Sequence, residues 1–277
     1  MCIMRYLFIL ILFSNFILVK SQEFTFDLQA IYNLSYQSDS LNPKSVKFLE
    51  MELLISNDRS IFQTLKRRRS DSLLAYQNTN HNTFTKGGLV LRLPSKFSYV
   101  VHKDNINISV FDSPFGIGTS GKEIIYNYIE KPIVNWRIKN DTIHLANHVC
   151  QKAETFYGGR LWIAWFALDI PISDGPYKFS GLPGLIMQIY DSKKYWNFTL
   201  VNLNRNKITH KLNFQKWYIY QNKSKEELYN DRRVYQTNLI TSLESQGIDV
   251  NDTEYLKIKN TWNDLLKSDN NWIELYP

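Results

Sequence analysis

The chain has 277 residues, of which 44% are hydrophobic and 14% aromatic, so it can bury a sizeable core in one domain of moderate size. Its formal net charge of +7 is a mild excess for this length. Cysteine occurs just twice, at Cys2 and Cys150. This usage excludes a small extracellular module stapled by disulfides.

The N-terminus is typical of a secretory signal peptide. Arg5 provides a positive start, and residues 6–19 are almost wholly apolar but too short for a convincing membrane span. We predict cleavage before Gln22, giving a signal peptide over 1–21 and a single domain over 22–277; a retained N-terminal anchor is the alternative. The sequence therefore predicts export to the periplasm or cell envelope, with no transmembrane segment in the mature chain.

Short strands dominate the region before residue 160. Apolar residues alternate at period two or form short runs, which predicts strands over 24–36, 47–56, 89–93, 97–102, 106–111, 124–129, 134–138 and 142–155. We expect Asn140 and Asp141 to form a tight turn between the last two. Gly158-Gly159 predicts a two-residue hairpin. The following strand, 161–166, is apolar on both faces, which indicates a central strand covered on both sides.

Two further strands, over 185–190 and 195–203, precede a helical C-terminal part. Ser224 and Glu227 have the spacing of a capping box, and the helix they begin is predicted to end near Gly247. A second helix is predicted to begin at Asp252 or Thr253. Each should need a sheet to bury its apolar stripe. The predicted fold is α+β: a mainly antiparallel β-sheet, curved or a half-barrel, with two C-terminal helices.

Several sequence patterns resemble functional motifs, but the residues around them disfavour those functions. Residues 115–123 contain Gly-x-Gly-x-x-Gly, but Glu123 replaces the Ser or Thr of a P-loop and a strand is predicted next, so we expect no nucleotide. The basic run 66–69 is interpreted as solvated, with no nucleic acid as partner. His144, His148 and Cys150 have the spacing of one face of one strand, which makes them weak candidates for metal ligands. A small buried thiol is the favoured interpretation of Cys150.

No catalytic motif is found in the sequence, so we predict a protein that is not an enzyme and uses no cofactor. The carboxylates Asp169, Asp174 and Asp191, near Arg160 and Lys178, could do acid–base work. Turn formation is the simpler role for Asp174 and Asp191.

A segment dense in glycine and proline follows the apolar strand 161–166. Proline fixes φ and glycine adopts conformations that other residues avoid, so this segment should follow a fixed, non-repeating path. The family motif consists of Gly175, Pro176, Gly181, Leu182, Pro183, Gly184, Leu185 and Ile186, and residues 150–153, 159–160, 164–166 and 170–172 accompany it. Together they resemble the GLPGLI family of exported Bacteroidetes proteins. This resemblance is best over about 136–203 and looser elsewhere, as at 270–275. It implies an envelope protein of about this size and no established activity, cofactor or catalytic residue.

The leading functional hypothesis is non-enzymatic binding of an apolar small molecule or lipid. Trp165, Tyr177, Phe179 and Leu182 are the candidate contacts, because aromatic side chains gather beside an unusually specified backbone. The sheet with helices also looks like the half-barrel of lipoprotein carriers, an analogy of fold alone. The first alternative is a protein partner of an outer-membrane transport or secretion system. The second is a metal-binding envelope protein.

Overall fold

The computed structural model describes residues 22–66, 83–86, 89–92, 97, 99–112, 123–133, 135–212, 218–245, 247, 249 and 251–276. The predicted signal peptide, most of the glycine-rich segment 115–123 and residues 67–69 of the basic run lie outside these ranges. The strands of the N-terminal half are β1 (Gln22–Phe26), β2 (Leu28–Gln37), β3 (Val46–Ile55), β4 (Arg59–Thr64), β5 (Thr83–Lys86), β6 (Leu89–Arg92), β7 (Val100–Asp104), β8 (Ile108–Asp112) and β9 (Glu123–Glu130).

The second half continues with strands and ends in two helices. Its elements are β10 (Arg137–Leu145), β11 (His148–Tyr157), β12 (Arg160–Ala167), β13 (Ile186–Asp191), β14 (Trp196–Asn204), β15 (Ile208–Leu212), β16 (Tyr218–Asn222), α3 (Lys225–Ser245) and α4 (Thr253–Ser268). No helix among the described residues combines the length and apolarity that crossing a membrane requires.

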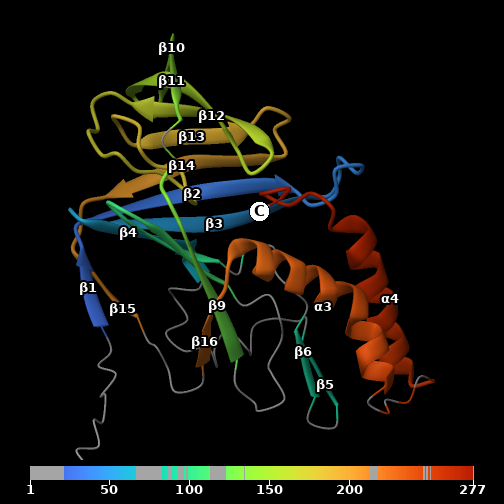
Figure 1. Cartoon of the computed structure of the whole chain (residues 1–277). Coiled ribbons are helices and arrows are strands. Elements are labelled where there is room, and N and C mark those ends of the chain that lie inside the picture. The colour runs from blue at the N-terminus through green and yellow to red at the C-terminus, as the bar shows by residue number, and fades with distance from the viewer. Residues whose placement is uncertain are drawn as a thin grey trace, which may run out of the picture.

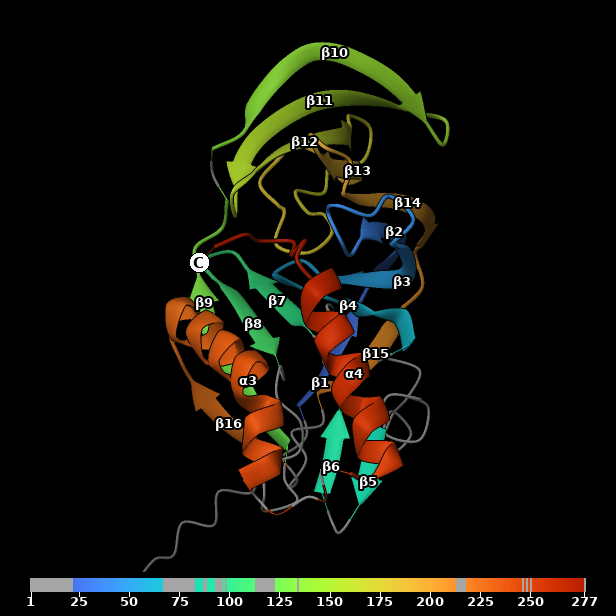
Figure 2. The ribbon, with the colours of Figure 1, turned by 90° about the vertical axis from the view of Figure 1, so that its right-hand side faces the viewer.

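The fold is built on one open sheet of 12 strands in the order β10-β11-β12-β13-β14-β2-β3-β4-β7-β8-β9-β16. Its described neighbours pair antiparallel, apart from the parallel pair β9–β16. The sheet is curved, with β10 and β11 arching over the end away from the helices (Figures 1 and 2). This arrangement, with two C-terminal helices, confirms the predicted α+β class.

The main core lies on one face of this sheet. It joins side chains from β2, β3, β4, β7, β8, β9, β11, β12, β13 and β14 with the segment that connects β12 to β13. Aromatic packing is dense: the rings of Tyr36 and Trp196 stack with centroids 4.8 Å apart, and Phe62 and Phe198 meet edge to face at 6.0 Å. Such pairs add to the free energy gained by burying apolar area.

The predicted capping box is confirmed at the start of α3. The Ser224 backbone N–H donates to Glu227 Oε2 at 2.7 Å, and the Glu227 N–H donates to Ser224 Oγ at 3.1 Å. Helix α3 meets the sheet at its start, where Leu228 joins the main core, but its later turns pack against α4. Leu239 and Leu243 of α3 and Trp262 of α4 form a small separate cluster, so the expectation that each helix buries its stripe on the sheet is wrong for α4.

Two predictions about strands β10, β11 and β12 are wrong. The tight turn lies at Ala146–Asn147, where both residues have positive φ, while Asn140 and Asp141 fall within an irregularity of β10. Strand β12 is third from the edge of the sheet, and Leu161 on its outer face is 40% exposed, so that face is not fully covered. Strands β4, β5, β15 and β16 were not predicted.

Candidate functional site

The segment between β12 and β13 follows an irregular path, and backbone hydrogen bonds join its start to its end. The Ala167 N–H donates to the Leu185 carbonyl oxygen at 2.9 Å, and the Leu185 N–H donates to that of Ile170 at 3.0 Å. At Gly184, an added Cβ would lie 2.0 Å from the Ala167 carbonyl oxygen. This close approach of two backbone segments requires glycine. We call residues 171–185 the motif segment.

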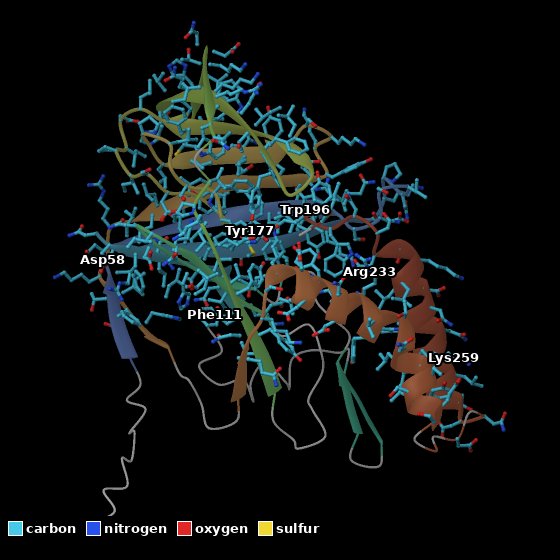
Figure 3. All side chains as sticks on the ribbon, in the orientation of Figure 1. Asp58, Phe111, Tyr177, Trp196, Arg233 and Lys259 are labelled. Carbon is cyan, nitrogen blue, oxygen red and sulfur yellow. The ribbon has the colours of Figure 1, made fainter. Side chains whose placement is uncertain are left out.

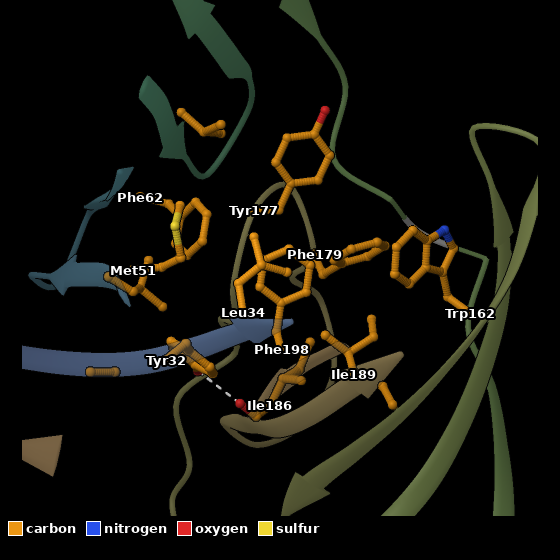
Figure 4. Packing of buried hydrophobic residues seen from close by; sticks show 14 of the residues in the cluster. Tyr32, Leu34, Met51, Phe62, Trp162, Tyr177, Phe179, Ile186, Ile189 and Phe198 are labelled. Atoms are coloured by element: carbon orange, nitrogen blue, oxygen red, sulfur yellow. Dashed lines mark hydrogen bonds between the residues drawn. The ribbon is translucent and has the colours of Figure 1, made fainter. Parts of the chain in front are cut away.

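The four predicted ligand contacts are packed inside the protein. Trp165, Tyr177, Phe179 and Leu182 are 9%, 1%, 0% and 1% exposed. The Phe179 ring centroid lies 4.7 Å from that of Trp162, and Figure 4 shows Tyr177 and Phe179 among the packed side chains of the sheet. These residues anchor the motif segment to the core, so an accessible site has to be sought on its other surfaces.

One line of residues across the sheet lies beneath the motif segment. Directly paired residues on neighbouring strands project to the same face. The pairing register gives a row across β2, β3, β4, β7, β8 and β9, which we call the transverse row: Leu28, Ile55, Ser60, Lys103, Ile108 and Glu130. Lys103 Nζ donates to the Gly175 carbonyl oxygen at 2.6 Å, and Lys178 Nζ lies 2.7 Å from Glu130 Oε2. The motif segment therefore meets the row at two polar positions.

At the Glu130 end, a buried cluster of charges ties the motif segment to the C-terminal tail. The Lys178 and Glu274 side chains are both 0% exposed, with Nζ and Oε1 2.6 Å apart. Lys225 Nζ lies 2.5 Å from Glu274 Oε2 and 2.8 Å from Glu130 Oε1. Burial opposes both charges, but the partners outweigh it: the pKa of Lys178 is raised and that of Glu274 is lowered. Two cations and two carboxylates thus balance.

The C-terminal tail, 269–276, is held by further buried contacts and returns to the sheet after α4 (Figure 1). Arg160 Nη1 donates to Asp191 Oδ2 at 3.1 Å, and its Nη2 donates to Asn271 Oδ1 at 2.6 Å. At Gly158 of the β11–β12 hairpin, an added Cβ would lie 2.7 Å from Glu274 Cγ. The Gly-Gly hairpin therefore forms a turn and also leaves the space that the C-terminal tail occupies.

A pocket of about 500 Å³ lies at the other end of the transverse row. Its floor consists of Leu28, Ile55, Ser60 and Lys103, one residue from each of four adjacent strands. The walls come from two strand turns, the start of β2, Pro132 and the motif segment: Asp27, Ser56, Asn57, Asp58, Arg59, Asp104, Asn105, Pro132, Pro171, Ile172, Ser173, Asp174, Ser180 and Gly181. Asp58 marks its position at the left of Figure 3, on the side of the molecule opposite α3 and α4.

The charged groups of this pocket differ in depth. Lys103 Nζ lies 2.5 Å from Asp174 Oδ1, with side chains 5% and 12% exposed. Burial lowers the pKa of Lys103, and Asp174 opposes this shift. At the mouth, Arg59 Nη2 lies 2.6 Å from Asp58 Oδ2, and both side chains are open to solvent. The inner pair is therefore preorganised, while the outer pair can rearrange around a ligand.

Ser60 is the unusual residue of the pocket floor. It is 2% exposed, and its hydroxyl has no hydrogen-bond partner among the described residues. A buried hydroxyl without a partner costs free energy, and most buried polar groups in proteins are paired. The pocket thus contains a polar group that the described part of the protein does not satisfy.

The predicted weak metal candidates do not come together. The Ala146–Asn147 turn separates His144 on β10 from His148 and Cys150 on β11, and the register points His144 to the opposite face. The prediction that the three share one strand is therefore wrong. His148 Nδ1 instead lies 2.7 Å from Asp169 Oδ2. Within the described ranges, no group of three or more His, Cys, Asp or Glu side chains could hold a metal ion.

Cys150 lies away from the pocket and offers no activated nucleophile. Its side chain is buried, and this burial raises the pKa of the thiol to about 11. The thiolate is the reactive form, so a thiol with this pKa is inert near neutral pH.

The groups that do line the pocket are suited to hydrogen bonding and to recognising charge. Sequence reasoning missed Ser60 and Lys103, whose role depends on strand register.

Comparison with known proteins assigns no activity to this arrangement. A family model described as "Protein of unknown function (Porph_ging)" matches residues 159–188, from the β11–β12 hairpin through the motif segment. No curated protein matches the chain. Two structures of PNGF-II, in the P21 and C2 space groups, are similar to it with TM-scores of 0.49 and 0.47 and identities of 12% and 13%. Each covers 75% of this chain, which spans about a third of theirs, 33% and 32%.

Proposed function

We propose that the protein is an exported, non-enzymatic binding protein whose ligand occupies the pocket beside the motif segment. The observation that carries this proposal is the Ser60 hydroxyl, buried without a described partner on the pocket floor. A ligand that hydrogen-bonds this group would remove the cost of leaving it unpaired. The pocket volume of about 500 Å³ is in the range of small-molecule sites. The signal-like residues 1–21 support export.

The lining points to an amphipathic ligand. Of the 18 residues around the pocket, 12 are polar, which departs from the apolar small molecule or lipid expected from the sequence. Leu28, Ile55, Pro132, Pro171 and Ile172 supply the apolar surface. An apolar body against these residues would leave a polar end for Ser60 and Lys103. Small-ligand sites generally combine apolar contact with a few placed polar groups in this way.

The motif segment gives this site a rigid wall. Tyr177 and Phe179 anchor it in the core, and Lys178 ties it to Glu274. Lys103 binds the Asp174 carboxylate and the Gly175 carbonyl oxygen. A wall fixed from three directions loses little conformational freedom when a ligand binds, and this preorganisation favours affinity. The glycine and proline content would then serve the shape of a binding site.

Native mass spectrometry of protein purified from its own host tests the proposal. Ser173 is an exposed wall residue, so Ser173→Trp should block the pocket without disturbing the core. Ser192→Trp, at an exposed turn outside the pocket, is the matched control. The proposal predicts a bound small-molecule mass on the wild type and on the control that is lost from Ser173→Trp. A bare protein mass throughout, or a mass retained by Ser173→Trp, would refute it.

A further inference from the structure

The inner end of the pocket offers donors for a neutral acceptor. Around Lys103 Nζ, the described contacts are the Gly175 carbonyl oxygen and Asp174 Oδ1. An ammonium has three N–H donors, so these contacts leave one for a ligand. Ser60 is paired with Lys103 on the adjacent strand and contributes its hydroxyl. A ligand cation here would be repelled by Lys103, whereas a carbonyl oxygen could accept from both groups.

The outer part of the pocket is acidic. The lining includes four carboxylates, Asp27, Asp58, Asp104 and Asp174, against two cations, Arg59 and Lys103. The Lys103–Asp174 pair closes the inner end, which leaves three carboxylates around one arginine at the mouth. This imbalance favours a cationic group on the outer part of the ligand and disfavours an anionic one.

The spacing between these two regions matches one basic residue. Asp58 lies two residues before Ser60, and two residues of extended chain span roughly 7 Å, so acceptor and cation would be about 7 Å apart. A lysine bridges such a separation between its own carbonyl oxygen and its ammonium group, and its aliphatic stem would lie on Ile55 and Ile172.

We infer that the ligand is a lysine-containing peptide segment, bound through a backbone carbonyl at Ser60 and Lys103 and through its ammonium group among the mouth aspartates. This inference rests on the proposed function, because it takes the pocket as the ligand site. A fatty acid that placed its apolar chain on the pocket floor would bring its carboxylate to an acidic mouth. A peptide offers the amide, the aliphatic stem and the cation in one residue.

Three blocked peptides that differ in one side chain test the inference: acetyl-Ala-Lys-Ala-amide, the same peptide with norleucine, and the same peptide with glutamate. Binding is followed by methyl NMR at Ile55 and Ile172, the two pocket isoleucines. We expect the lysine peptide to bind about tenfold more tightly than the norleucine peptide, since each exposed charge pair contributes modestly. The glutamate peptide should bind most weakly, and added salt should reduce the preference for lysine.

Variants separate the charge from the pocket itself. Asp58→Asn combined with Asp104→Asn should remove the preference for lysine over norleucine, whereas Asp141→Asn, an exposed carboxylate on β10, should leave it unchanged. Ser60→Ala should weaken the lysine and norleucine peptides equally. If all three peptides bind alike and still depend on Ser60, the basic class is wrong and the pocket proposal stands. If no peptide shifts the Ile55 and Ile172 signals and the host protein carries no mass, both proposals fail.

Discussion

The buried charge cluster gives the sharpest stability prediction. Glu274→Gln keeps the size of the side chain but removes the charge that faces Lys178 at 2.6 Å, both groups being fully buried. Removing one partner of a buried pair costs about 3–5 kcal/mol. Lys178 keeps Glu130 at 2.7 Å and the Tyr128 hydroxyl at 3.0 Å, which places the loss at the lower end, about 3 kcal/mol. For a chain of this size, the melting temperature should fall by roughly 6–12 °C.

Urea unfolding of the wild type and the variant measures this loss of free energy directly. The control is Asp231→Asn, which breaks a partly exposed pair with Lys223 and should cost about 1 kcal/mol at most. Adding Lys178→Met to Glu274→Gln should recover part of the loss, because the buried cation that lost one of its two carboxylate partners is removed as well. Equal small losses for Glu274→Gln and Asp231→Asn would show that the cluster does not hold the tail.

Three further predictions follow from single positions. Burial raises the pKa of Glu274 but two lysines lower it further, to about 2, so its stabilising contribution, complete above the ordinary value of 4.5, should be lost as the pH falls toward 2. Unfolding free energies across this pH window should therefore depend less on pH in Glu274→Gln, and an unchanged slope would contradict the pairing. Gly184→Ala should cost roughly 3 kcal/mol or more in urea unfolding, because its Cβ would clash with backbone, whereas Pro183→Ala at the exposed neighbour should cost far less. Cys150 should not react with a thiol reagent in the native protein at neutral pH and should react after unfolding; rapid native labelling would refute its burial.

Features specified by neighbouring residues could be predicted from the sequence. The Ser224–Glu227 capping box and the Gly158-Gly159 hairpin depend on contacts within a few residues, and both occur where their patterns indicate. The prediction of a turn at Asn140-Asp141 was wrong, although it also rested on neighbouring residues alone. The chain turns at Ala146–Asn147 instead, which leaves the favoured turn residues within an irregular strand.

The candidate site could not be predicted, because it depends on pairing between distant strands. Ser60 and Lys103 meet through the register of β4 and β7, and Lys103 reaches Gly175 across 72 residues. The aromatic residues of the motif were predicted to contact a ligand, but Tyr177 and Phe179 pack in the core. Composition indicates that such side chains are important without showing whether they face a ligand or the protein interior.

A crystal structure of the protein purified from its own host, without refolding, tests the central claim most directly. The account predicts electron density for a small ligand in the pocket, with an acceptor atom within hydrogen-bond distance of Ser60 Oγ and Lys103 Nζ. A pocket that holds only water, with ligand density at another position on the protein, would contradict it.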